Sequence, residues 1–221
     1  ALSLLGDHGD VELRAQALIG LGNARHIDRH HQSNTDWYLK ALSLLGEYGD
    51  IELRAQALIG LGNARYRDRE HQRDTDWYLK ALSLLGDHGD VELRAQALIG
   101  LGNARYTDKS HSRNDWYLKA LGLLGGHGDV ELRAQALIGL GNARYRDREH
   151  QRDTDWYLKV LSLLGDHGDV KLRAQALIGL GNARYTDKSH SRNDWYLKAL
   201  GLLGGHGDVE LRAQALIGLG N

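Results

Sequence analysis

The sequence predicts an all-α fold, a right-handed α-solenoid (superhelix) of stacked antiparallel helical hairpins. Three observations lead to this prediction. The 221 residues repeat with a period of 39 or 40 residues, apolar residues recur three or four positions apart within each repeat, and glycine and aspartate separate the apolar segments. A period of this length indicates small supersecondary units that stack to share one core.

The repeats extend over the whole chain. Units begin at residues 1, 41, 81, 120, 160 and 199, and the last is incomplete, so we predict a single repeat array over residues 1–221. Residues 67–142 also recur as 146–221 with two changes, Ala81 to Val160 and Glu92 to Lys171. Such close copying indicates a recent or engineered duplication, and the start in mid-repeat is typical of a fragment.

The first helix of each repeat is best marked between Asp50 and Tyr66 in the second unit. Asp50 follows a glycine and can cap the helix, while Glu52 suits the positive end of its dipole. Two apolar rows at helical spacing predict burial on two sides. The rows are Leu53, Ala57, Leu61 and Ala64, and Ile51, Ala55, Leu58 and Gly62.

The second helix is expected from about Asp76, after a polar loop or frayed helix start over roughly residues 67–74, with Thr75 or Asn114 as its cap. Glycines such as Gly46 and Gly86 are expected to end these helices in the left-handed conformation. The 39-residue units lack one residue between Tyr106 and Trp116. Because a deletion within a helix would rotate everything beyond it by ~100°, the deletion must fall in a connection.

A period near 40 residues also fits β-propeller blades and the HEAT and armadillo repeats. Propeller blades carry a Trp-Asp pair, whereas this chain has the reverse order, as at Asp36 and Trp37. The alternating strands of a blade are also missing. HEAT and armadillo units remain possible on period alone, since both are stacked helices.

A recurring motif distinguishes among the helical repeats. Leu21, Gly22, Asn23 and Ala24 form an LGNA sequence, which recurs from Leu61, Leu101, Leu140 and Leu180; Trp77, Tyr78, Lys80, Ala81 and Leu82 follow in the second helix. With these residues the whole chain resembles the tetratricopeptide repeat (TPR) family, in a 39/40-residue variant. The chain departs from the family pattern in lacking proline and in carrying Arg65 and Asp74 at motif positions.

Candidate binding residues form a stripe along the first helix, where Glu52, Gln56, Ile59, Asn63 and Tyr66 lie three or four apart and away from the main packing rows. In the TPR family this helix lines the inner groove, and the resemblance implies that its asparagines hold the extended backbone of a partner. Asparagines that only pack or meet water are the alternative. The candidates are Asn23, Asn63, Asn103, Asn142 and Asn182, with Gln56, Gln96 and Gln135 and with Tyr66, Tyr106, Tyr145 and Tyr185.

Catalytic residues, metal sites and cofactors are not predicted. Gly20 and Gly22 match only half of a dinucleotide fingerprint, with no strand before them. Most of the 12 histidines are interpreted as loop residues copied with the repeat, and cysteine is absent. With 28 basic against 29 acidic side chains, no excess charge attracts nucleic acid or a membrane surface. No apolar run is long enough to span a membrane, so we expect a soluble, cytoplasmic protein, although the redox compartment stays open.

Other prominent side chains are interpreted as structural. The tryptophans at repeat spacing are expected to be core wedges; they are Trp37, Trp77, Trp116, Trp156 and Trp195. Arg54 and Arg65 are expected to pair with carboxylates of the neighbouring helix, such as Asp76. Gly22 is expected to allow close approach of two helices, and Gly20 to open space on the surface.

These observations favour a protein–protein interaction scaffold that binds an extended peptide or a partner protein in the concave groove, and not an enzyme. Two alternatives remain. One is the ligand-sensing repeat region of a larger nucleotide-binding signalling protein; the other is a self-associating structural or engineered array without a ligand. The incomplete end repeats also predict head-to-tail self-association, because each would expose an apolar face that a neighbouring unit covers.

Overall fold

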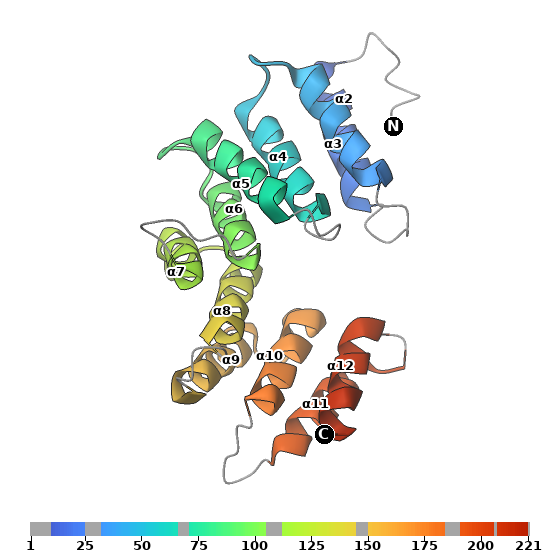
Figure 1. The fold of residues 1–221 in the computed structure, drawn as a ribbon, viewed down its shortest axis with the longest axis vertical. Helices are drawn as coiled ribbons and strands as arrows, with labels where there is room; N and C mark the ends of the chain where they lie inside the picture. Colours follow the sequence, from blue (N-terminus) through green and yellow to red (C-terminus); the bar gives the residue numbers. More distant parts are fainter. Residues whose placement is uncertain are drawn as a thin grey trace. The chain divides into compact units, whose positions relative to one another are not determined.

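The structure, a computed structural model, describes residues 10–24, 32–65, 71–104, 112–144, 150–183, 191–205 and 207–220. Every regular element in these ranges is a helix. Figure 1 labels them: α2 (Val11–Ala24), α3 (Gln32–Leu45), α4 (Ile51–Arg65), α5 (His71–Leu85), α6 (Val91–Asn103), α7 (Arg113–Leu124), α8 (Val130–Arg144), α9 (His150–Leu164), α10 (Val170–Asn182), α11 (Arg192–Leu203) and α12 (Val209–Gly220). Even numbers are the first helices of the repeats, and odd numbers are the second helices.

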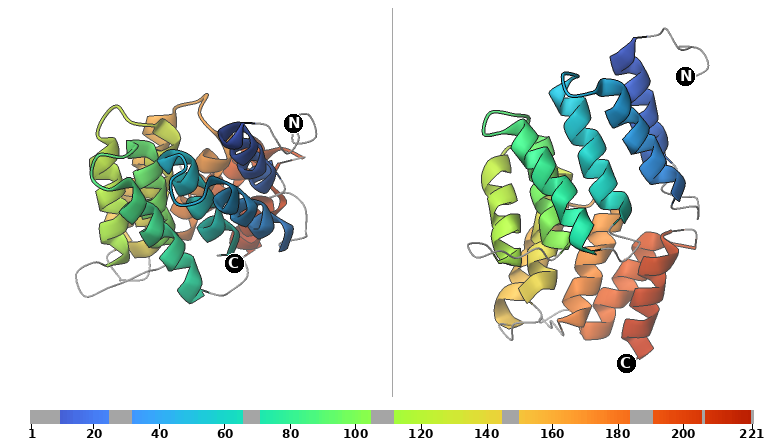
Figure 2. Two further views of the ribbon diagram at one scale, coloured as in Figure 1. Left: turned by 90° about the horizontal axis from the view of Figure 1, so that it is seen from above. Right: turned by 45° about the horizontal axis from the view of Figure 1, so that its top comes forward.

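The chain divides into two compact units, Ala1–Ser110 and His111–Asn221. In the first unit each helix from α2 to α6 packs against the next, and α4 also contacts α2 and α6. In the second unit the same order runs from α7 to α12, and α10 also contacts α8 and α12. Each unit is therefore an α-solenoid of helical hairpins stacked in chain order (Figure 2). That both belong to one array over residues 1–221 stays a prediction.

Small and branched apolar side chains of the first helices are buried, as the sequence predicts. In α4, Ala55, Ala57 and Leu61 are inaccessible to solvent, and Leu101, Leu140 and Leu180 repeat this burial. Ile51 departs from the predicted second row, since 51% of its surface is exposed. As the first residue of α4 it stands at the helix end, where fewer neighbours surround it.

The expected core role of the tryptophans is confirmed. Trp116 and Trp195 are 5% exposed, while Trp37, Trp77 and Trp156 are half-buried and pack against the core clusters of their units. A lysine three residues later covers each ring, with its ammonium 4.4 to 5.1 Å from the ring centroid. The indole therefore contacts the core and carries a cation on its solvent side.

The turn between repeats follows one pattern. Gly46 and Gly86 end α3 and α5 with φ of 61° and 58°, which confirms the expected positive φ. At the equivalent Gly125, however, ψ is −152°, so the backbone leaves the left-handed helical region for one that only glycine adopts readily. After three intervening residues Asp50 caps α4, accepting from the Leu53 amide at 2.7 Å, as predicted.

An arginine side chain binds the backbone of this turn. The predicted partner of that arginine, a carboxylate of the neighbouring helix, was wrong. Arg54 donates from Nη1 to the carbonyl oxygen of Glu47 at 2.6 Å, and not to the predicted carboxylate of Asp76. The same bond recurs at 2.6 to 2.9 Å from Arg94, Arg133, Arg173 and Arg212. The carbonyl oxygens beyond a helix end lack partners within the helix, and the guanidinium satisfies one of them. The side chain of Arg65 lies outside the described part of the structure.

The second helices begin earlier than predicted. Helix α5 starts at His71 rather than Asp76, and Thr75 lies inside it, 7% exposed. In the 39-residue repeat, Asn114 also lies within its helix. The residue preceding α7 is Ser112, whose amide and hydroxyl donate to the Asp115 carboxylate at 2.6 and 2.8 Å. This Ser-x-x-Asp pattern is a capping box, and its hydrogen bonds fix the first residue of α7.

Candidate peptide-binding face

A tyrosine of each second helix inserts its ring beside glycines of the first helices. Around Tyr78, a Cβ added at Gly62 of α4 would lie 2.6 Å from the ring, and one added at Gly100 of α6 would overlap it. Tyr38 lies in the same way beside Gly22 and Gly60. We call this space the glycine slot. It fixes the ring, because any larger residue at either glycine would occupy its place.

The hydroxyl of the slotted tyrosine binds the asparagine of its own repeat. Tyr78 donates to Asn63 Oδ1 at 2.8 Å. The bond recurs from Tyr38 to Asn23, from Tyr157 to Asn142 and from Tyr196 to Asn182, at 2.6 to 2.9 Å. Burial raises the pKa of Tyr38 above its ordinary value, which keeps that phenol neutral and able to donate. In these four pairs the amide oxygen faces the protein.

The predicted amides lie at the surface of the first helices. All five candidate asparagines, at positions 23, 63, 103, 142 and 182, are exposed; Gln56 and Gln135 are exposed as well, while Gln96 is half-buried. Since α2, α4 and α6 pack side by side in one unit, and α8, α10 and α12 in the other, each unit places its amides on adjacent helices. The candidates Tyr66, Tyr106, Tyr145 and Tyr185 lie outside the described residues.

One member of the predicted stripe is not at the surface. Ile59 is 4% exposed, and its counterparts in α2, α6, α8 and α10 are equally buried. The adjacent first helices cover this side of α4, as their contacts indicate. In α12 the corresponding Ile217 is 65% exposed. Ile59 is therefore a packing residue, and the polar stripe consists of the glutamate, glutamine and asparagine positions.

Acidic side chains lie at the amino-terminal ends of these helices. Glu12, Glu52 and Glu92 are exposed in the first turns of α2, α4 and α6. In the second unit Lys171 interrupts the series, and its Nζ lies 2.9 Å from Asp208 Oδ2. That hydrogen bond, together with the amide of Leu211, lowers the pKa of Asp208. The two units thus share their amides and differ in charge at one edge.

Sequence reasoning missed the tyrosine. The sequence motif includes Tyr78 without giving it a contact, and Gly20 and Gly22 are expected to have separate roles. In the structure, Gly60 and Gly62 each receive a tyrosine ring, from α3 and α5 respectively. The available signal was the joint recurrence of Gly-Leu-Gly-Asn and Trp-Tyr in successive repeats. Gly20 itself has open space around it, as expected.

No group of three or more His, Cys, Asp or Glu side chains in the described ranges could hold a metal ion. The described histidines of the interhelical turns, His88, His127 and His167, are exposed. Within the same residues, no helix combines the length and the hydropathy needed to cross a bilayer.

No family model and no curated protein matches the chain. Among solved structures it is similar to YrrB, described as a TPR protein with an unusual peptide-binding site, at 18% identity and a TM-score of 0.45, over 90% of this chain and 89% of that one. The helix order and contacts within each unit establish the fold class: all-α, an α-solenoid of tandem helical repeats.

Proposed function

We propose that the chain is a TPR-type scaffold that binds an extended peptide, or an extended segment of a partner protein, across the exposed amides of its first helices. The recurring bond from tyrosine to asparagine carries this proposal. Because Tyr78 holds Oδ1 of Asn63, the Nδ2 group is left to face the ligand. An amide held in this way offers hydrogen-bond donors, which suit the carbonyl oxygens of a peptide backbone.

The spacing of the helices fits such a ligand. Packed helices lie about 8–10 Å apart, and an extended chain rises about 3.3 Å per residue. A peptide that crosses α2, α4 and α6 would therefore meet one asparagine at about every third residue. Contacts to the backbone alone do not depend on the ligand's side chains, so the exposed glutamates at the edge of the first unit would select basic or neutral over acidic sequences.

Affinity in this scheme comes from several weak contacts. A single amide contributes little, because it exchanges a hydrogen bond to water for one to the ligand. Repeats on a rigid scaffold act together once the first is bound. We therefore expect affinity to fall steeply when repeats are deleted, and the scaffold needs no catalytic residue.

The test begins with peptides recovered by the 221-residue chain and identified by mass spectrometry. One of them is synthesised, and its affinity is measured by calorimetry. Replacing Asn23, Asn63 and Asn103, the candidate asparagines of the first unit, with Ala should weaken binding of a peptide that crosses α2, α4 and α6 at least tenfold. The variant Tyr38→Phe/Tyr78→Phe keeps both rings in their slots but releases the amides of Asn23 and Asn63, and we expect a smaller loss.

A matched control replaces Ser43, Ser83 and Ser162, which are exposed on the second helices. Their change to Ala should leave affinity unaltered. Circular dichroism checks that every variant folds. Unchanged affinity in a folded triple-asparagine variant would show that these amides only bind tyrosine and water. A region that senses ligands for a larger signalling protein would instead require a nucleotide-binding module in the same polypeptide, which the full-length sequence would reveal.

Self-association is a second candidate, which the surface of α12 favours. Leu216 and Ile217 are 55% and 65% exposed, whereas their counterparts Leu177 and Ile178 are buried beneath neighbouring helices. Gly220, the counterpart of Gly181, has no atom near its Cβ position. A hairpin of a second copy could cover this surface. Sedimentation of the 221-residue chain should then show mass rising with concentration, and Leu216→Glu should abolish the rise; a constant monomer mass would exclude this candidate.

A further inference from the structure

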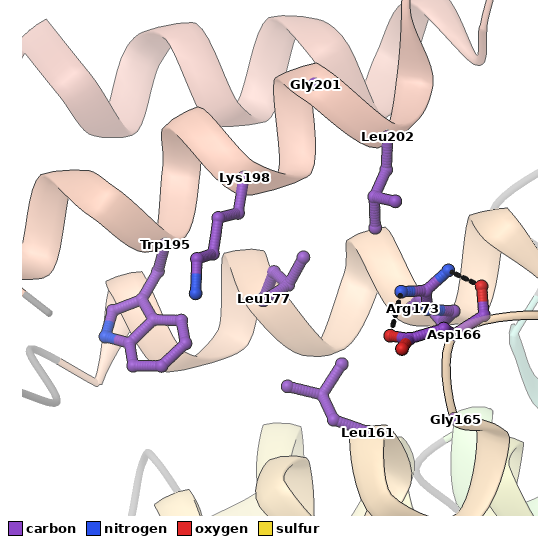
Figure 3. A pocket seen from close by; sticks show the side chains of 9 residues that line it. All are labelled: Leu161, Gly165, Asp166, Arg173, Leu177, Trp195, Lys198, Gly201 and Leu202. Carbon is purple, nitrogen blue, oxygen red and sulfur yellow. Dashed lines mark hydrogen bonds and ion pairs between the residues drawn. The ribbon is translucent and has the colours of Figure 1, made fainter. Parts of the chain in front are cut away.

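A pocket opens in the second unit between two second helices, away from the amides of the first helices. Its volume is about 510 Å³, within the range of small-molecule sites. Figure 3 shows α11 contributing Trp195, Lys198 and Leu202 on one side, α9 contributing Leu161 on the other, and Leu177 of α10 between them. The walls are thus mainly apolar.

Glycine helps to make this space. Gly201 lines the pocket, and no atom lies within 4 Å of the position that its Cβ would occupy. The preceding repeat carries Ser162 at the same place. A side chain at residue 201 would therefore project into open space rather than into the core, and the glycine at this position leaves that space to the pocket.

Two cations, Arg173 and Lys198, line the pocket. Arg173 donates to the Asp166 carbonyl oxygen at 2.6 Å and lies 3.4 Å from its carboxylate, as the dashed lines in Figure 3 mark. Lys198 places its ammonium 5.1 Å from the centroid of the Trp195 ring and extends over the apolar floor. Asp166 lies beside the arginine, and an anion entering beside Trp195 would meet the ammonium of Lys198.

We propose that this pocket binds a small carboxylate with a flat apolar body, the body lying among Leu161, Leu177 and Leu202 beside the indole and the carboxylate reaching Lys198. Apolar walls favour the body through desolvation. The lysine supplies the charge complementarity that selects an anion over a neutral or cationic analogue of the same shape. This site is separate from the peptide-binding face, so either proposal can fail without the other.

Three matched probes test the proposal on the full chain: 2-naphthylacetate, the alcohol 2-naphthylethanol and the amine 2-naphthylethylamine. Binding is followed by the indole N–H resonance of Trp195, assigned with Trp195→Phe, while Trp156 of the preceding repeat serves as an internal reference. We expect the anion to bind more tightly than the alcohol by about 1.5- to 5-fold, the range of an exposed ion pair, and the amine to bind most weakly.

Two variants separate the apolar and the charged contributions. Gly201→Leu fills the pocket and, being directed into open space in a helix, should fold and lose binding of all three probes. Lys198→Met keeps the apolar stem and should bring the anion and the alcohol to equal affinity. Ser83→Leu, the corresponding position of the first unit, is the control and should change nothing.

Each other outcome overturns the proposal. Equal affinity of the anion and the alcohol for the unaltered chain would leave an apolar surface with no selectivity for carboxylates. Binding that survives Gly201→Leu, or shifts of Trp156 as large as those of Trp195, would place the probes elsewhere. No shift of Trp195 at millimolar probe would show that the pocket binds none of this class.

Discussion

Two consecutive hairpins of the second unit differ in length yet build the same core. Helices α8 and α9 of the 40-residue repeat have 15 residues each, whereas α10 and α11 of the 39-residue repeat have 13 and 12. Tyr157 and Asn142 are 15 positions apart, and Tyr196 and Asn182 are 14 apart. Their hydrogen bonds nevertheless measure 2.8 and 2.9 Å.

The comparison teaches that the contacts at the hairpin core specify the repeat, and not its length. The shorter repeat lacks one residue between Tyr185 and Trp195, and its two helices are shorter than α8 and α9. In the shorter repeat, Asp194 accepts from Ser191 before α11, and Arg192 Nε donates to the Gly181 carbonyl oxygen at 3.3 Å. These polar contacts define the ends of the shorter helices.

The largest expected effect tests whether the two cores are equivalent. Leu140 and Leu180 are both inaccessible to solvent, so Leu140→Ala and Leu180→Ala should each lower the free energy of unfolding by ~2–5 kcal/mol. We expect the two losses in urea denaturation to agree within about 1 kcal/mol, the scatter of similar sites. Leu219 is only half-buried in α12, and Leu219→Ala should cost less. Strongly unequal losses at Leu140 and Leu180 would contradict a shared core.

A second prediction concerns a substitution that fills the glycine slot. Tyr157 is 3% exposed and bound to Asn142, so its ring cannot swing away from a methyl group at Gly179. Gly179→Ala should therefore destabilise the chain by ~1–3 kcal/mol, as overpacked sites do, although alanine favours the helix by about 1 kcal/mol.

Gly20→Ala is the matched control for the slot. Gly20 holds the same place in its repeat as Gly179, but nothing lies within 4 Å of its Cβ position. The helix preference then acts alone, and the change should stabilise α2 by up to ~1 kcal/mol. Thermal unfolding followed by circular dichroism measures both variants. A shift of the same sign in the two would mean that the tyrosine ring does not occupy the slot tightly.

Much of the fold could be predicted from the sequence because it depends on periodicity. The aspartate caps, the positive-φ glycines and the buried leucines each follow from local spacing, and the structure confirms them. The start of α5 could not be read in this way. Thr75 is a favourable cap by residue type. In the structure it is buried and lies inside the helix, because tertiary packing overrides such local preferences.

Less of the candidate site could be predicted from the sequence. Helical spacing places Asn63 and Ile59 on one side of α4, and it cannot say which of them a neighbouring helix covers. Stacking of adjacent first helices buries Ile59 and leaves Asn63 at the surface. The bond from Tyr78 to Asn63 joins residues 15 positions apart, a separation that no helical period encodes. Contacts between helices therefore set the chemistry of the face.

The smallest expected effect on stability comes from a charge difference between the repeats of α8 and α10. In the first turn, α8 carries Glu131 and α10 carries Lys171. The Lys171 hydrogen bond, followed by the Leu211 amide, holds the pKa of Asp208 below its usual value of 3.8. A lowered pKa in the folded state contributes stability at higher pH, and this stability is lost as pH falls below 3.8 through the folded value.

Lys171→Glu removes this ion pair and restores the residue found in the sequence copy at position 92. Because Lys171 is more than half exposed, we expect under ~1 kcal/mol of change at neutral pH, as is usual for surface pairs, and a gain at the helix dipole offsets part of it. The pKa is the sharper readout. Titration of the Asp208 carboxyl carbon by NMR should show its pKa rising in Lys171→Glu. If Lys171→Glu leaves the pKa of Asp208 unchanged, the capping amide of Leu211 is the cause of the lowered pKa. The charge difference between the two repeats would then have no effect on the cap.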